Sequence, residues 1–257
     1  MTGEASWIDA DGTRLGEAAA LDRLAGAVVA LLGERHDRAA DHRWQARVIA
    51  GLAARRRPVV VGFEMFPRHA RPALDAWVAG ATDRAGFLAA SRWAEAWGMD
   101  PDLYMPIFEL CRAEGLAMRG LNVDRPIVSL VGRDGWEALP EAERRWLTPA
   151  RPASPAYRRA IFELTGGARP DRKAQSPDDP AFDRFARAQG VWDRAFACAL
   201  AGILAETPGA LAVGVIGRGH LERRLGVVEQ LDDLGVGPAL VALPDGAAGA
   251  GDLVVAD

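Results

Sequence analysis

The sequence has 257 residues, of which 49% are hydrophobic, and this is ample for a buried core and excludes a disordered or fibrous chain. Its 31 basic and 35 acidic side chains are mixed along the chain and give a formal net charge of -4. The basic field that nucleic acid requires is therefore missing, which disfavours nucleic-acid binding.

The sequence predicts neither a secretion signal nor a membrane span. Met1 to Asp11 is mostly polar, and no apolar stretch approaches the roughly 20 residues that cross a bilayer. We therefore expect a cytoplasmic protein without a transmembrane segment, or a periplasmic or envelope-associated one if a leader was removed. Cys111 and Cys198 lie in apolar helical patterns without CxxC spacing, which predicts two buried free thiols.

The first part of the chain alternates between two hydrophobic patterns. Apolar runs that end at polar or glycine residues are typical of buried parallel strands, whereas amphipathic stretches with helical spacing indicate helices. In chain order we predict a strand over Val28 to Leu32, a helix over His42 to Ala54, a strand over Val59 to Phe63, and short helices over Arg71 to Ala79 and Arg84 to Ala90.

The second part continues this alternation after one long interruption. We predict a helix over Pro106 to Glu114, a strand over Leu116 to Leu121, a long helix over Phe182 to Ala205, strands over Leu211 to Ile216 and Leu240 to Leu243, and an edge strand over Asp252 to Val255. The stretch from Arg125 to Arg187 has no clear strand and is interpreted as a helical excursion over the sheet. The whole predicts a single α/β domain over residues 1–257, with a mostly parallel central sheet flanked by helices.

Polar residues gather where the predicted strands end. Glu34 and His36 follow the first strand, Glu64 follows the second, and His220 follows the fourth. Ligands of parallel sheets bind outside the carboxyl ends of the strands. We therefore predict one functional pocket that these four residues line, with His42, Asn122 and Asp124 beside it.

Each of these residues also has a purely structural explanation. Glu64 can be a buried carboxylate that caps the next helix, His42 can simply begin a helix, and His69 can be a solvated surface residue. Their coincidence at neighbouring strand ends has no packing reason, and buried charges need partners. The set could hold a divalent metal, act as an acid and base pair, or form the polar rim of a larger ligand.

Several familiar motifs are absent from the sequence. It contains neither HExxH nor a CxxC pair, so a zinc hydrolase has no direct support. A GxSxG motif and a glycine-rich GxGxxG turn after the first strand are also missing, which disfavours a serine hydrolase and a dinucleotide site.

An apolar wall is predicted beside the polar rim. It comprises Trp93, Trp97, Met99, Tyr104, Met105 and Phe108. Ordinary core packing explains the tryptophans. Tyr104 is one of only two tyrosines and precedes Pro106 at an irregular helix start, where a side chain can point into a pocket. A phenolate is a ligand for ferric iron in tyrosine-ligated haem proteins.

Together these segments resemble the ChaN-like haem-binding family of iron-regulated proteins. The resemblance covers Trp7 to about Leu243 and also extends, more distantly, to the Tiki and erythromycin-esterase enzymes. It is carried by Leu32-Gly33-Glu34-Arg35-His36-Asp37, His42-x-x-Gln45, Gly62-Phe63-Glu64-Met65-Phe66, Tyr104-Met105-Pro106 and Gly217-Arg218-Gly219-His220.

The resemblance implies haem binding in a pocket formed by a homodimer. It implies Tyr104 as the axial ligand of the haem iron and basic side chains near the propionates, where Arg68 or Arg71 would take the place of a lysine. His36, His42 and His69 are the further residues predicted to contact the cofactor. Family members are often envelope lipoproteins of haem uptake, but the lipobox cysteine of such proteins is not seen here.

Three functional hypotheses follow. The first, which we favour, is a non-enzymatic haem-binding protein for haem uptake, storage or transfer in iron acquisition. The second is a hydrolase of esters or peptides, in which Glu34, His36, Glu64 and His220 activate water directly or through a divalent metal. In the third, the same residues are only a structural hydrogen-bond network.

Overall fold

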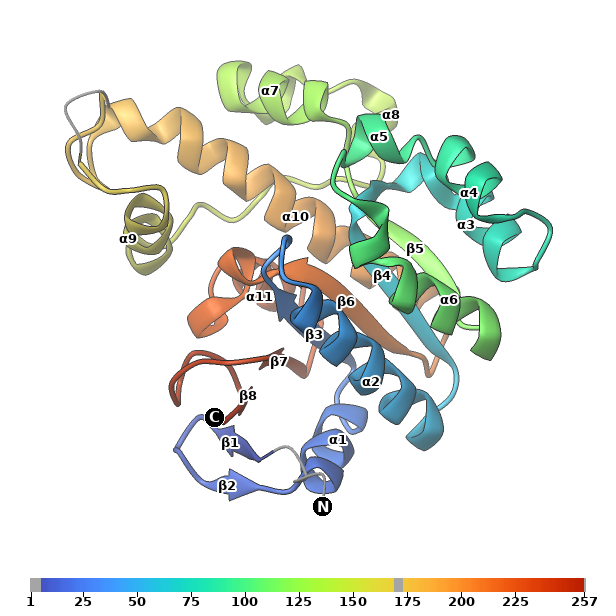
Figure 1. Cartoon of the computed structure of the whole chain (residues 1–257). Helices are drawn as coiled ribbons and strands as arrows, with labels where there is room; N and C mark the ends of the chain where they lie inside the picture. The colour runs from blue at the N-terminus through green and yellow to red at the C-terminus, as the bar shows by residue number, and fades with distance from the viewer. Residues whose placement is uncertain (1–5, 169–172, 257) are drawn as a thin grey trace.

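The computed structural model describes residues 6–168 and 173–256, which build one eight-stranded sheet in the order β2-β1-β8-β7-β3-β6-β4-β5 (Figure 1). The parallel strands are β3 (Val29–Glu34), β4 (Val59–Pro67), β5 (Ala117–Asn122), β6 (Leu211–Gly217), β7 (Ala239–Leu243) and β8 (Leu253–Val255). The chain is therefore an α/β protein with a mostly parallel sheet, as its alternating pattern predicts.

The outer edge of the sheet differs from the prediction. β8 was expected to be an edge strand, but it lies between β7 and β1 (Trp7–Asp9), and β2 (Arg14–Leu15) extends the sheet further. β1 pairs antiparallel with both β8 and β2. The sequence did not reveal β1 and β2 because no apolar run between residues 6 and 16 is longer than two residues.

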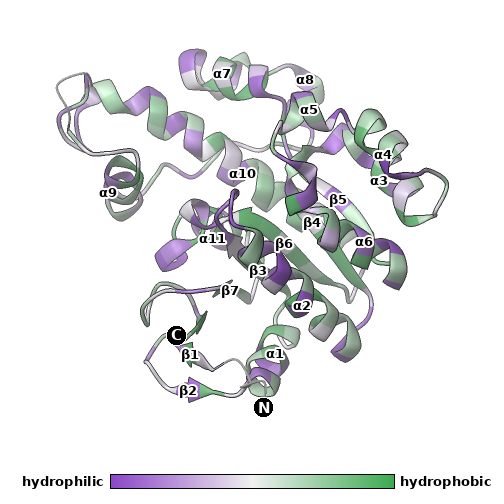
Figure 2. Cartoon of the chain, in the orientation of Figure 1, coloured by the Kyte–Doolittle hydropathy of each residue, from purple (hydrophilic) through white to green (hydrophobic). Residues whose placement is uncertain are grey.

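Helices cover both faces of the sheet. One face carries α1 (Glu17–Ala25), α2 (Ala39–Arg55), α3 (Arg71–Val78), α4 (Arg84–Ala90), α5 (Trp93–Ala96) and α6 (Met105–Glu114), and the other carries α10 (Asp183–Glu206) and α11 (Val227–Asp233). Figure 2 shows hydrophobic residues concentrated along the central strands, between these two layers. Short turns of 3-10 helix outside the 125–187 stretch include η1 (Arg68–Ala70), η2 (Pro101–Leu103), η5 (Arg218–His220) and η6 (Glu222–Arg224).

The predicted helical excursion is confirmed. It consists of α7 (Arg125–Asp134), η3 (Trp136–Ala138), α8 (Glu141–Arg144), α9 (Pro155–Leu164) and η4 (Pro180–Phe182). Figure 1 shows these elements and the first half of α10 gathered at the end of the sheet where β3, β4 and β6 finish. Separate hydrophobic clusters attach α7 and α9 to α10. The excursion therefore walls the region where the predicted site residues lie.

Two further expectations can be compared with the structure. Both cysteines are free thiols, but only Cys111 is buried, because Cys198 on α10 remains partly exposed. In the described ranges, no helix combines the length and apolar character of a membrane span. The interpretation of residues 1–257 as a single domain stays a prediction.

Candidate functional site

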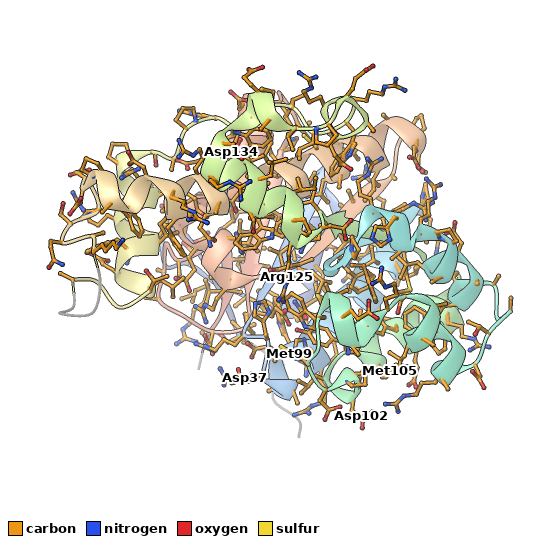
Figure 3. The ribbon with its side chains drawn as sticks, turned by 90° about the horizontal axis from the view of Figure 1, so that it is seen from above. Asp37, Met99, Asp102, Met105, Arg125 and Asp134 are labelled. Carbon is orange, nitrogen blue, oxygen red and sulfur yellow. The ribbon has the colours of Figure 1, made fainter. Side chains whose placement is uncertain are left out.

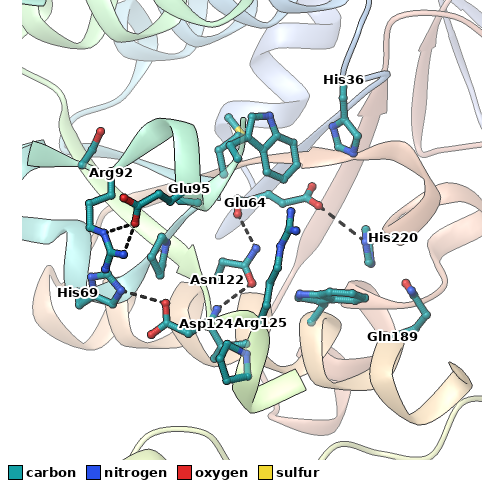
Figure 4. A pocket seen from close by; sticks show the side chains of 18 residues that line it. His36, Glu64, His69, Arg92, Glu95, Asn122, Asp124, Arg125, Gln189 and His220 are labelled. Carbon is teal, nitrogen blue, oxygen red and sulfur yellow. Dashed lines mark hydrogen bonds and ion pairs between the residues drawn. The ribbon is translucent and has the colours of Figure 1, made fainter. Parts of the chain in front are cut away.

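Two cavities lie at the carboxyl ends of the central strands. The smaller one, of about 390 Å³, is lined by residues that include Glu64, Trp97 and Arg125, and Figure 4 shows it from close by. The larger one, of about 650 Å³, lies on the side of α9 and the start of η5. His36, Gln189 and His220 line both cavities, so the two meet at these side chains.

Glu34, the last residue of β3, is the centre of a buried network. Its Oε1 accepts hydrogen bonds from His36 Nδ1 at 2.7 Å and from the Tyr104 hydroxyl at 3.1 Å. Its Oε2 lies 2.6 Å from His42 Nδ1, although no aligned hydrogen bond reaches this oxygen among the described residues. Two imidazoles and one phenol thus surround a single carboxylate that is 1% exposed.

The charges of this network stabilise one another. Burial by itself favours the neutral carboxyl, but the contacts from His36 and His42 outweigh it and lower the pKa of Glu34. Burial likewise opposes protonation of His36 and His42, yet Glu34 raises the pKa of both imidazoles. At neutral pH the carboxylate is therefore ionised, and each imidazole turns its Nδ1 towards it.

A second carboxylate and imidazole pair faces the cavities from the other side. His220 Nδ1 lies 2.6 Å from Asp193 Oδ1, and the Tyr157 hydroxyl donates to Asp193 Oδ2 at 2.6 Å. Burial disfavours the imidazolium, but Asp193 and then Glu64 overcome this and raise the pKa of His220 to about 9. His220 is therefore protonated at neutral pH.

The sequence analysis missed Asp193 and Tyr157. Asp193 is fully buried, on the face of α10 that turns towards the sheet, 27 positions before His220. An acidic residue among the apolar positions of a predicted helix was the available signal, because a buried carboxylate needs a partner.

Glu64 lines the smaller cavity, and its charge acts to raise the pKa of both His36 and His220. Its Oε2 accepts a hydrogen bond from the Gly217 N–H at 2.5 Å, and its Oε1 lies 3.9 Å from His220 Nε2. The Asn122 side chain donates to the Glu64 backbone carbonyl at 2.8 Å (Figure 4). The structure therefore brings Glu34, His36, Glu64 and His220 together, as predicted for the strand ends.

Gly217 is required by the close approach of the His36 ring. A Cβ at this position would lie 2.6 Å from His36 Cε1 and 2.9 Å from His36 Nε2. We expect Gly217→Ala to displace His36 from the junction of the cavities and to destabilise the protein by about 1–3 kcal/mol. Chemical denaturation measures the effect.

Gly202→Ala is the matched control for this change. Gly202 lies in α10, and a Cβ there meets no atom within 4 Å. Alanine is the better helix former, so this variant is expected to be neutral or slightly stabilised. Equal destabilisation of the two variants would contradict the steric argument.

The remaining predicted residues occupy different places. His69 lines the smaller cavity and lies 3.1 Å from Asp124, whereas Arg68 stacks at 4.1 Å over the Trp146 ring outside that cavity. Arg71 pairs with Glu206 at 2.9 Å on the surface and lines neither of the two cavities. His42 is fully buried behind Glu34 and also lines neither.

Tyr104 is buried rather than directed into a cavity. Its side chain is 0% exposed, packs on the His42 ring, and receives a hydrogen bond from Trp97 Nε1 at 3.3 Å. Burial, followed by the charge of Glu34, raises its pKa far above the usual range. Coordination of iron by this phenolate would require loss of the proton that it donates to Glu34, and the ligand role of Tyr104 stays a prediction.

The apolar wall divides between core and cavity. Trp97 and Met99 line the cavities, whereas Trp93, Met105 and Phe108 are buried in the main core. Across residues 6–168 and 173–256, no group of three or more histidine, cysteine or acidic side chains is arranged to hold a metal ion.

The chain matches one known protein family. A profile described as haem-binding uptake, Tiki superfamily, ChaN matches residues 20–231. No curated protein sequence matches the chain.

Several solved structures share the fold. ChaN of Campylobacter jejuni, from a structure described as cofacial haem binding, is 16% identical with a TM-score of 0.76, and the match covers 98% of this chain and 96% of that one. A mutant of the erythromycin esterase EreC is 14% identical with a TM-score of 0.51, over 92% and 76% of the two chains. The type III effector HopBA1 is 12% identical with a TM-score of 0.50, over 92% and 90%.

Proposed function

Because the chain belongs to the haem-binding uptake family ChaN of the Tiki superfamily, we propose that it binds haem where its two cavities meet. On this proposal the protein serves haem uptake, storage or transfer in iron acquisition. The observation that carries the proposal is the His36 imidazole, which stands at this junction with 38% of its side chain exposed.

The residues around the junction fit a haem. Glu34 holds His36 through Nδ1, so that Nε2 has no hydrogen-bond partner among the described residues and is available to iron. Metal-bound imidazoles commonly donate their other ring N–H to a carboxylate in this way. Trp97 and Trp192 offer apolar surface, and Arg125 points its guanidinium into the smaller cavity (Figure 4). Haem would supply the iron centre, and these side chains would hold it.

His36 therefore competes with Tyr104 for the role of axial ligand. The exposed imidazole needs no rearrangement to reach a ligand, whereas the Tyr104 phenol is covered by Trp97 and hydrogen-bonded to Glu34. Histidine is an ordinary proximal ligand of haem iron. We assign the ligand to His36 and keep Tyr104 as the alternative.

Titration with haem, followed by the shift of the Soret band, tests this proposal. His36→Ala is expected to weaken binding by more than about tenfold and to change the spectrum. Glu114→Ala is the control, because it changes an exposed side chain that lines neither cavity, and it should change affinity little. Loss of the shift in Tyr104→Phe, with His36→Ala unaffected, would transfer the ligand role to Tyr104. A wild-type protein that gives no Soret shift would end the proposal.

The two carboxylate and imidazole pairs favour hydrolysis as a second candidate function. Glu34 orients His36, Asp193 orients His220, and Glu64 lies between them, which is an arrangement suited to general acid and base work. His36 would act as the base and the protonated His220 as the acid. An esterase and peptidase screen, repeated with His36→Ala and Glu64→Ala, tests this candidate, and activity that is indifferent to both changes would remove it.

The homodimer and the compartment of the protein belong to the same proposal. The homodimer is proposed from the family resemblance, since a single exposed hydrophobic residue such as Leu164, 69% exposed, does not mark an interface by itself. Sedimentation with and without haem measures the oligomeric state. The cytoplasm remains our proposed compartment, with the periplasm or envelope as the alternative.

A further inference from the structure

Three arginines converge on the carboxylate of Asp245, and two of them, Arg35 and Arg218, line the larger cavity. Arg35 donates to both oxygens of Asp245, at 2.7 and 2.9 Å, and Arg218 donates to Oδ1 at 2.6 Å. Arg38 donates to Oδ2. We call Arg35, Arg38 and Arg218 the arginine clamp. Planar guanidinium groups on both oxygens form the geometry by which proteins recognise carboxylates.

Two members of the clamp form part of the wall of the larger cavity. Arg35 immediately precedes His36, and Arg218 lies two positions before His220, so both follow strands that end at the site. Arg35 and Arg218 line this cavity together with Met99, Ile161, Leu164 and Phe185. Asp37 and Met99, both labelled in Figure 3, also line this cavity. A cationic clamp thus borders an apolar surface.

The carboxylate in the clamp comes from a connection rather than from the sheet. Asp245 lies between β7 and β8 and is followed by the glycine- and alanine-rich stretch 246–251. Its side chain is 22% exposed, and the three guanidinium groups hold its pKa well below the usual range. A residue on such a connection can leave the clamp without displacing a strand.

The charges around the clamp are balanced only while Asp245 is in place. The other acidic neighbours are Asp41, 3.8 Å from Arg35 and 3.5 Å from Arg38, and Glu222, which pairs with Arg218. Without Asp245, the three guanidinium groups pair with these two carboxylates alone. Asp37 lines the same cavity but pairs with none of the three arginines among the described residues. The charge of the clamp therefore favours binding of one external carboxylate in place of Asp245.

We propose that the larger cavity binds an apolar molecule that carries a carboxylate, with the arginine clamp on the carboxylate and Asp245 as the internal group that the ligand displaces. That this molecule is haem, bound through a propionate, rests on the proposed function. A fatty acid offers the same chemistry. Because the ligand must displace Asp245, its affinity depends on how strongly the connection between β7 and β8 holds Asp245 in the clamp.

Binding of three probes to four variants tests the inference. The probes are haem, haem dimethyl ester and dodecanoate, measured by absorbance or calorimetry. Arg35→Gln should weaken haem binding about tenfold and leave the ester unchanged, because the ester lacks the charged oxygens. Asp245→Asn should strengthen haem binding about tenfold, because it removes the competing charge.

Two control variants, and the melting temperature of every variant, show whether a change in affinity comes only from a general loss of stability. Arg57→Gln removes an exposed arginine that pairs with Glu114 just before β4 begins, at the opposite end of the sheet. Asp22→Asn removes an exposed carboxylate that pairs with Arg55. Neither control should change the affinity for any probe.

The outcomes separate this inference from the proposed function. Equal responses of haem and its ester to Arg35→Gln, or weaker haem binding in Asp245→Asn, would overturn the clamp. If wild-type protein ignores haem but binds dodecanoate with the same dependence on Arg35 and Asp245, the clamp stands and the haem proposal fails. If wild-type protein binds none of the probes, both fail.

Discussion

Glu34→Ala is expected to lower the free energy of unfolding by about 3–5 kcal/mol at neutral pH, which is the usual cost of removing one partner from a buried charged network. The change leaves His36 and His42 without their carboxylate and leaves the Tyr104 hydroxyl without its acceptor. His42 and Tyr104 are fully buried, so water cannot replace the lost oxygens. Chemical denaturation of both proteins measures the difference.

The pH dependence of this difference identifies its cause. The lowered pKa of Glu34 means that its contribution is present above the ordinary value of 4.5 and is lost as the pH falls through the folded value. The raised pKa of His36 and His42 means that their contribution is present below 6.5 and is lost as the pH rises through their folded values. The gap between wild type and variant should therefore be widest between these two values.

Glu114→Ala is the control for the Glu34 experiment. Glu114 pairs with Arg57, and both side chains are about half exposed. Surface ion pairs contribute roughly 0–1 kcal/mol, so this variant should be nearly as stable as wild type at every pH. A Glu34 variant no less stable than the Glu114 variant would show that the buried network adds nothing to folding.

The approximate ends of the parallel strands were predictable because buried parallel strands appear in the sequence as short apolar runs. Val59 to Phe63 and Leu211 to Ile216 are apolar runs broken only by a glycine, and both form buried strands. β4 continues past Glu64 to Pro67, whereas β6 ends three positions before His220. Since these strands are neighbours in the sheet, their ends meet. Sequence order and the rules for parallel sheets were therefore sufficient to bring Glu64 and His220 together.

The direction of each side chain was not predictable in the same way. The sequence pattern places His42 and Tyr104 beside the predicted site. In the structure both side chains contact Glu34 and are buried in the core, so neither faces a cavity. That choice depends on three-dimensional contacts between residues up to 70 positions apart. Asp193 was not predicted as the partner of His220 for the same reason, because it lies on α10, a helix that packs on a face of the sheet far away in the sequence.

Asp193→Asn is expected to lower the pKa of His220 from about 9 to near or below its ordinary value of 6.5. Asp193 is the nearest negative charge, at 2.6 Å, while Glu64 lies 3.9 Å away and burial opposes the imidazolium. With four histidines in the chain, the imidazole proton signals in NMR spectra can be followed individually. The signal of the exposed His69 serves as the internal control and should be the same in wild type and variant.

The same pair makes the stability of the protein depend on pH. A folded pKa of about 9 against an ordinary 6.5 corresponds to a contribution on the order of 3 kcal/mol. Because the pKa is raised, this contribution is fully present below about pH 6.5 and is lost as the pH rises through about 9. Wild-type protein should lose this stability across that interval, whereas Asp193→Asn should be less stable below it and show a flatter profile. A wild-type His220 that titrates at or below its ordinary value would refute the pairing, and with it the positive charge that faces Glu64.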